Sequence, residues 1–142
     1  MRIDAVVADA NVLLSAIVGK AALRVLAEFG IILHVAGFNA EEVTEYLPLM
    51  ATKYGLPVDL IELQWKLLPI RIHSMDDYKD HFKGALQDLA TRDAEDAHAL
   101  ALARSLQLPL WSNDRHLMNL GTEVYSTARL LRVLELGRAE ES

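Results

Sequence analysis

The sequence of 142 residues contains no cysteine. Disulfide bonds and thiolate metal sites are therefore excluded, and nothing indicates an oxidising compartment. The N-terminal region also lacks an uninterrupted apolar run, because Asp4 and Asp9 break it. We therefore expect no signal peptide and no membrane span, and we expect the protein to be cytoplasmic.

Positive charge is scarce as well. The chain has 14 Lys and Arg residues against 20 Asp and Glu residues, which leaves a formal net charge of -6. This balance counts against nucleic-acid binding through a broad basic surface. It is compatible with binding through acids gathered around cations, because a bound metal ion reverses the local electrostatics.

Repeats, linkers and low-complexity segments are absent too, and 52% hydrophobic content is enough for one ordinary core. We predict a single domain over residues 1–137, followed by a frayed tail over residues 138–142. Apolar runs predict five strands. They are Ile3–Ala8, Ile31–Ala36, Pro69–His73, Pro109–Trp111 and Glu123–Tyr125. Helical segments between them imply parallel crossovers, and hence an α/β fold: a three-layer α/β/α sandwich around a central parallel sheet of about five strands.

Two helix starts are predicted from capping patterns. Asn39 followed by Glu42 has the spacing of an N-cap with a reciprocal acid, so we expect a helix from Asn39 to about residue 54. Ser74 followed by Asp77 has the same spacing and predicts one helix that continues to about residue 90.

Two later helices are also expected. One is rich in alanine, with Ala97, Ala99, Ala101 and Ala103 small enough for a close approach to the sheet. The other is a terminal amphipathic helix, which we predict to be capped by Thr127 and stopped by Gly137.

Carboxylates stand where predicted strands end. Asp9 follows the first strand, Asp114 follows the fourth, and Glu42 lies in the helix after the second. In open sheets of this kind, sites form outside the carboxyl ends of the strands, so we expect these three acids at one rim. Asp96 begins the alanine-rich helix, and its position depends on whether that helix starts near the same rim.

Each acid also has a purely structural interpretation. Asp9, Asp93 and Asp114 are suited to cap a following turn, and Glu42 to be the acid of a capping box. Capping, however, does not require several strand-exit acids on one rim. Crowded carboxylates raise one another's pKa values unless a cation offsets them, so the set as a whole favours a metal site.

Four stretches together resemble a PIN domain, the nuclease fold of VapC-like toxins and of related RNA-processing proteins. They are Asp9-Ala-Asn11, the acids near residue 42, Asp93-Ala-Glu-Asp96, and Ser112-Asn-Asp114-Arg-His-Leu117, and the resemblance covers essentially the whole chain. It implies a metal-dependent ribonuclease with a four-acid centre. Carried over one residue at a time, the catalytic acids fall on Asp9, Glu42, Asp96 and Asp114.

Some assignments within this resemblance stay open. Glu41 and Glu45 are close enough to Glu42 to be alternatives for the second acid. Asp93, Asn11 and Ser112 are expected to be supporting residues, and Asn11 and Ser112 could orient ligands or contact the phosphate.

Phosphodiester hydrolysis needs an activated water and neutralisation of charge on the phosphate. Mg²⁺ or Mn²⁺ held by hard oxygen ligands supplies both. We expect Asp9 and Asp96 to bind the ion directly. We expect Asp114 to be a further metal ligand. For Asp114 and Glu42 three tasks are open: to bind a second ion, to bind the ion through water, or to position the nucleophile.

The resemblance further implies partners. RNA is the expected substrate. A homodimer is expected, with the apolar helices from Glu42 to Leu68 as its surface. An antitoxin protein is expected if the chain is a toxin.

The residues are also compatible with two other functions. One is a Mg²⁺-dependent phosphohydrolase of small phosphate esters, although the first strand ends without a second aspartate and no strand-exit lysine follows the later strands. The other is a non-catalytic protein-interaction module.

Overall fold

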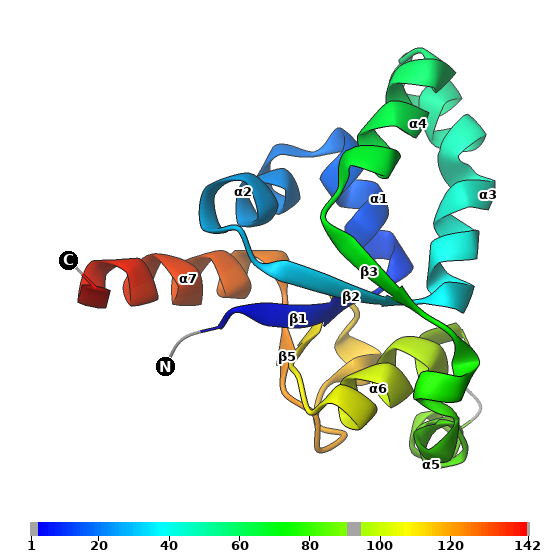
Figure 1. The fold of residues 1–142 in the computed structure, drawn as a ribbon, viewed down its shortest axis with the longest axis vertical. Coiled ribbons are helices and arrows are strands. Elements are labelled where there is room, and N and C mark those ends of the chain that lie inside the picture. The colour runs from blue at the N-terminus through cyan, green and yellow to red at the C-terminus, as the bar shows by residue number, and fades with distance from the viewer. Residues whose placement is uncertain (1–2, 91–94, 142) are drawn as a thin grey trace.

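The computed structural model describes residues 3–90 and 95–141, and five parallel strands form its central sheet (Figure 1). The strands lie in the order β3-β2-β1-β4-β5 and all neighbouring pairs are parallel. Their bounds are β1 Ala5–Ala8, β2 Ile32–Ala36, β3 Ile70–His73, β4 Leu110–Trp111 and β5 Val124–Tyr125. The predicted three-layer α/β/α sandwich is confirmed.

Helices cover both faces of this sheet (Figure 1). One face packs against α1 (Ala10–Val18), α2 (Lys20–Phe29), α3 (Gly37–Tyr54), α4 (Val58–Leu67) and α7 (Thr127–Glu141). The other face packs against α5 (Lys79–Leu89) and α6 (Glu95–Leu106). Two short 3₁₀ segments, η1 (Met75–Asp77) and η2 (Arg115–Leu117), complete the described elements. Within these residues, no helix is both long enough and apolar enough to cross a membrane.

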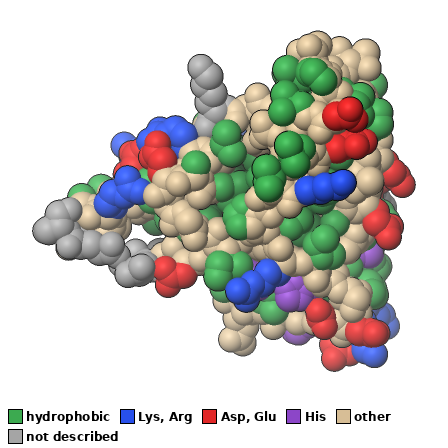
Figure 2. Space-filling view, turned by 45° about the horizontal axis from the view of Figure 1, so that its top comes forward, with side chains coloured by type: hydrophobic (Ala, Val, Ile, Leu, Met, Phe, Trp, Pro, Cys, Tyr) green, Lys and Arg blue, Asp and Glu red, His purple; other side chains and the backbone are tan. Residues whose placement is uncertain are grey.

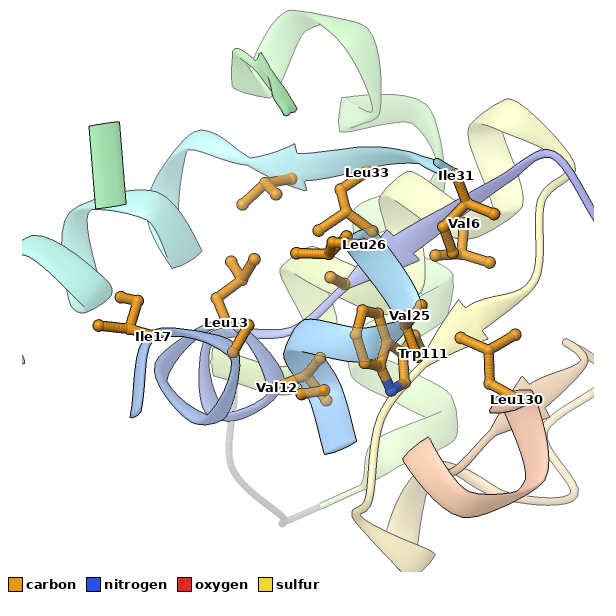
Figure 3. Close-up of a cluster of buried hydrophobic side chains, with 14 of the residues drawn as sticks. Val6, Val12, Leu13, Ile17, Val25, Leu26, Ile31, Leu33, Trp111 and Leu130 are labelled. Atoms are coloured by element: carbon orange, nitrogen blue, oxygen red, sulfur yellow. The ribbon is translucent and has the colours of Figure 1, made fainter. Parts of the chain in front are cut away.

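The strands alternate between two hydrophobic cores. Val6 belongs to the core under α1 and α2, whereas Val7 belongs to the core under α5 and α6. In β4, Trp111 belongs to the core under α1 and α2, and Leu110 belongs to the core under α5 and α6. Figure 3 shows Trp111 beside Val25 of α2. Because both faces are covered at the centre of the sheet, the central strand β1 is an apolar run without alternation, whereas the edge strand β3 alternates as Ile-Arg-Ile-His.

The alanine-rich helix packs as expected. Ala97, Ala99, Ala101 and Ala103 of α6 are all buried. Their small side chains leave room for a close approach of α6 to the sheet.

The predicted cap of α3 is wrong. The helix begins at Gly37, with Ala36 as its N-cap, so Asn39 lies inside the first turn. A Cβ atom on Gly37 would lie 3.2 Å from the carbonyl oxygen of His73. Glycine therefore lets the chain pass from β2 directly into a helix that packs against the end of β3, without the predicted turn.

The predicted helix from Ser74 is also wrong, because it is divided into two segments. The backbone of Tyr78, with φ of -137°, separates η1 from α5, and the Ser74 side chain makes no capping hydrogen bond. Tyr78 is buried in the core under α6, and that packing outweighs the continuous helical pattern of the sequence.

The ends of α7 differ from prediction as well. The hydroxyl of Ser126 accepts a hydrogen bond from the Arg129 amide at 3.2 Å, so Ser126 rather than Thr127 caps the helix. The helix then passes through Gly137 to Glu141. Gly30, which does end α2, has the left-handed φ of 59°. An interior glycine instead costs a helix only about 1 kcal/mol, which α7 tolerates.

Candidate active site

A cavity of about 540 Å³ lies at the carboxyl ends of the central strands. The chain leaves β1 toward β2 on one side, whereas β4 pairs with β1 on the other side, so the strand order reverses here. Ligands of open α/β sheets bind at such switch points. We call this the acid cavity. It is lined by Asp9, Ala10, Asn11, Leu14, Asn39, Glu42, Tyr46, Glu95, Asp96, Asp114 and His116.

The acid cavity contains all four acids proposed from the sequence. Asp9 follows β1, Asp114 follows β4, Glu42 belongs to α3 and Asp96 belongs to the first turn of α6. The position of Asp96 was open from the sequence. Its place in this lining shows that α6 begins at the rim to which β1 and β4 lead.

Asp9 is the most buried acid of the cavity, with 5% of its surface exposed. It is the N-cap of α1, and its Oδ1 accepts a hydrogen bond from the Val12 amide at 2.9 Å. Burial raises the pKa of Asp9, while hydrogen bonds from Ser112 and Val12 oppose the rise and the charge of Asp114 adds to it. The ionised form is thus disfavoured by its surroundings, and a nearby cation would offset that penalty.

Ser112 links two of the acids. Its buried hydroxyl hydrogen-bonds to Asp9 and accepts a hydrogen bond from the Asp114 amide at 3.1 Å. Asp114 in turn caps η2, because its Oδ1 accepts a hydrogen bond from the His116 amide at 2.9 Å. The hydroxyl therefore holds the end of β4 against the end of β1.

Glu42 is positioned by a residue that the sequence analysis did not place in the site. Asn39 is buried, and its Nδ2 donates a hydrogen bond to Glu42 Oε1 at 2.8 Å. Its Oδ1 is also buried, and among the described atoms it has no partner. The available signal was a polar residue three positions before an acid on a helix, a spacing that puts both on one face. In the sequence alone, the same spacing fits an N-cap equally well.

The structure also separates the three candidate glutamates. Glu42 lines the acid cavity, Glu41 lines a different cavity, and Glu45 is exposed on α3. Of the supporting residues, Asn11 lines the acid cavity from the first turn of α1. Asp93 lies outside the described residues.

The donor atoms of the acid cavity suit a hard, hydrated cation. They are carboxylate oxygens, with the unpaired Oδ1 of Asn39 as a further acceptor. Within residues 3–90 and 95–141, no three acidic or histidine side chains are close enough to form a ready ligand cluster. Mg²⁺ keeps several waters and takes only one or two carboxylates directly, so this arrangement fits an ion held partly through water.

Comparisons with known proteins identify the family and the fold. A model of the PIN domain family matches residues 7–135. The structure resembles the crystal structure of PAE2754 from Pyrobaculum aerophilum, with a TM-score of 0.69 and 16% sequence identity over 94% of this chain and 90% of that chain. At this identity, the likeness shows the fold alone. A search of curated proteins gave no match.

Proposed function

Because this chain belongs to the PIN domain family, whose members are typically metal-dependent nucleases, we propose that it is a metal-dependent endoribonuclease. The substrate is RNA, and its phosphodiester bonds are hydrolysed in the acid cavity with Mg²⁺ or Mn²⁺.

One observation carries this proposal. Four carboxylates from separate parts of the chain, Asp9, Glu42, Asp96 and Asp114, line one cavity at the switch point of the sheet. Capping explains the individual placement of Asp9 and Asp114. It does not explain why two strand ends, the second turn of α3 and the first turn of α6 present acids to the same space, at a cost in mutual repulsion.

Each residue has a task in the proposed reaction. A bound divalent ion neutralises phosphate charge and lowers the pKa of a coordinated water. Asp9 and Asp96 would bind that ion directly, and Asp114 would be a further ligand that binds through water. Glu42, held by Asn39, would position the attacking water. Ser112 keeps Asp9 and Asp114 in register, and Asn11 faces the cavity, where its amide would contact the phosphate.

Cleavage of single-stranded RNA in Mg²⁺ or Mn²⁺ tests the proposal. We expect Asp96→Asn and Asp9→Asn each to lower the rate by on the order of 100-fold or more, as removal of one electrostatic group does in other active sites. Asparagine is as good an N-cap as aspartate, so Asp9→Asn should preserve α1. Asp80→Asn, an exposed acid in the first turn of α5, is the matched control.

Three outcomes of these assays would contradict the proposal. If both cavity variants cut RNA as fast as the wild type, the site assignment is wrong. If small phosphate esters are hydrolysed and RNA is not, the protein is a phosphohydrolase. If divalent ions neither bind nor support any hydrolysis, it is an interaction module.

A toxin role is the narrower part of the proposal. A toxin would require an antitoxin protein to hold it inactive, and its expression alone would stop growth through RNA cleavage. We expect growth arrest on expression of the wild type and none with Asp96→Asn. Normal growth at equal levels of both proteins would contradict a toxin role without affecting the nuclease assignment.

A further inference from the structure

A second cavity, of about 640 Å³, lies beside the acid cavity. We call it the aromatic cavity. Its lining residues include Phe38, Glu41, Ile72, His73, Tyr78 and His98. They come from α3, from the end of β3 and the segment after it, and from α6. Nothing in the proposed hydrolysis uses this cavity.

The two cavities share the walls formed by α3 and α6. Phe38 and Glu41 are three residues apart, so they share one face of α3. Asn39 and Glu42 lie on the adjacent face and line the acid cavity. On α6, His98 is only two residues, or about 3 Å along the helix axis, beyond Asp96. Figure 1 shows α3 and α6 beginning at the same end of the sheet.

An aromatic platform is built into this cavity. The ring of Phe38 stacks on that of His98, with centroids 4.1 Å apart and planes at 8°. The ring of His98 is fixed in turn by Tyr78, whose hydroxyl lies 2.7 Å from Nδ1, and by Phe82 at 4.6 Å between centroids. Phe38 nevertheless keeps 38% of its surface exposed. An exposed ring held in one orientation is ready to stack with a planar ligand.

The rings of Phe38 and His98 both line the cavity, so the stacked pair offers a planar ligand an aromatic surface. His73 also lines the cavity, but both of its ring nitrogens are already engaged, Nδ1 with Asp77 and Nε2 with His34. Glu41 adds a carboxylate, which only accepts hydrogen bonds. A ligand that uses both the rings and Glu41 therefore combines a flat apolar face with N–H donors on its edge.

An unpaired nucleobase has both features. Single-stranded RNA is recognised by stacking of splayed bases on aromatic side chains, including Phe and His, and by hydrogen bonds to the base edge. Guanine presents two neighbouring N–H donors on its pairing edge, which match the two oxygens of one carboxylate, whereas uracil presents one. The cavity volume is in the usual range for small-ligand sites.

We propose that the aromatic cavity binds one unpaired base, with guanine preferred through Glu41, of a single-stranded RNA whose adjoining phosphate enters the acid cavity. This inference rests on the proposed nuclease function for its substrate class. A base inside a duplex cannot reach the platform, so the site selects single strands.

Oligonucleotide affinity tests the inference without any need for cleavage. Labelled single strands of uridine, with or without one guanosine, are titrated with the full chain in Ca²⁺, and binding is followed by fluorescence anisotropy. Phe38→Ala should weaken binding of the single strands roughly 5- to 100-fold, the range for loss of one base stack. Phe38→Trp should retain binding. Leu136→Ala, which removes a 59% exposed side chain from α7, far from both cavities in the chain and outside their linings, should change nothing.

Glu41 is tested separately from stacking. Glu41→Gln should reduce the preference for the guanosine-containing strand by roughly 10-fold, a loss within the range for one base contact, and leave the affinity for the uridine strand nearly unchanged. Glu45→Gln, an exposed acid one turn further along α3, is the matched control. The circular dichroism spectrum and thermal midpoint of each variant establish that it is folded.

The inference is overturned if folded Phe38→Ala binds single strands as the wild type does, or if duplex affinity falls equally. It is also overturned if Phe38→Ala alters self-association in sedimentation but not RNA affinity, because the cavity would then be a protein interface. The guanine preference is contradicted if it survives Glu41→Gln. A Phe38-dependent affinity together with an Asp96→Asn variant as active as wild type would leave the base site standing and refute the cleavage site.

Discussion

Asp9 combines two roles that impose opposite demands on its carboxylate. As the N-cap of α1 it accepts the Val12 amide, which favours the charged form. Its burial and the neighbouring charge of Asp114 favour the protonated form. Burial is the largest of these effects, so the net result is a raised pKa of Asp9. A metal ion resolves this conflict, because it compensates the charge that burial penalises.

The raised pKa predicts a pH dependence of stability. The folded protein keeps the Asp9 proton to a higher pH than the unfolded chain, where the pKa is about 4. The contribution of Asp9 to the unfolding free energy is therefore full below pH 4, falls as the pH rises to the folded-state pKa, and stays low above it. Without divalent ions, Asp9→Asn should be more stable relative to wild type at pH 7 than at pH 4, as measured by urea unfolding. A constant difference between the two proteins would contradict the raised pKa.

Asn39 is the residue on which the placement of Glu42 depends. We expect Asn39→Ala to lower RNA cleavage by about 10-fold, since removing a group that orients a metal-site ligand typically costs 10- to 100-fold. Glu42→Gln should lower it further, and Glu45→Gln should leave the rate unchanged. Single-turnover rates measure all three. Equal loss in the Glu42 and Glu45 variants would show that neither acts through the acid cavity.

The residues at the acid cavity differ in how far the sequence predicts them. Asp9 and Asp114 follow apolar runs directly, so the rule for parallel sheets places both at one rim. Glu42 could not be chosen over its neighbours, because the choice depends on where α3 begins. That start is set by the contact of Gly37 with β3, which is 33 residues or more away in the chain.

Gly37 and Gly84 are both helical glycines, but they differ in the space available for an added Cβ atom. A Cβ on Gly37 would meet the His73 backbone carbonyl at 3.2 Å, whereas one on Gly84, inside α5, would meet only the end of the Arg104 side chain at 3.9 Å. Gly37→Ala should therefore destabilise the protein by about 1–3 kcal/mol through overpacking. Gly84→Ala should stabilise it by up to about 1 kcal/mol through helix propensity. Urea unfolding measures both, and the same sign for the two would contradict the close contact at Gly37.

Element order and type follow from the sequence because apolar runs and helical spacing are local signals. The residues at which helices begin and end are predicted less well from the sequence, because tertiary packing determines them. Gly30 adopts a left-handed backbone and ends α2, but Gly137 is carried through by α7. Tyr78 divides a predicted helix because its ring is buried against α6. At Tyr78, a contact that is distant in the chain outweighs the local pattern.

At the scale of the whole molecule, the hairpin of α3 and α4 is the surface most suited to self-association. Figure 2 shows hydrophobic side chains over this end of the molecule. Tyr46, Leu49, Leu60, Leu63 and Leu67 of these helices are all exposed. Isolated exposed apolar residues are common, but a group on one hairpin is typical of an interaction site. We propose a homodimer through this surface.

Charge substitution on the hairpin tests the dimer. Leu63→Arg should weaken dimerisation by at least about 10-fold, because it places a charge in an apolar interface. Leu136→Arg, on α7, changes a side chain of similar exposure, 59% against 52% for Leu63, and should leave the dimer intact. Sedimentation at several concentrations measures both, and a wild-type protein that remains monomeric would contradict the proposed interface.

The proposed hydrolysis requires that the acid cavity bind a divalent ion, and calorimetry at fixed ionic strength measures Mn²⁺ binding directly. We predict that the wild type and Asp80→Asn bind Mn²⁺ with equal affinity, and that Asp9→Asn and Asp96→Asn bind it at least about 10-fold more weakly. Equal Mn²⁺ affinity in all four proteins, or no binding by the wild type, would contradict the metal site and the nuclease mechanism that rests on it.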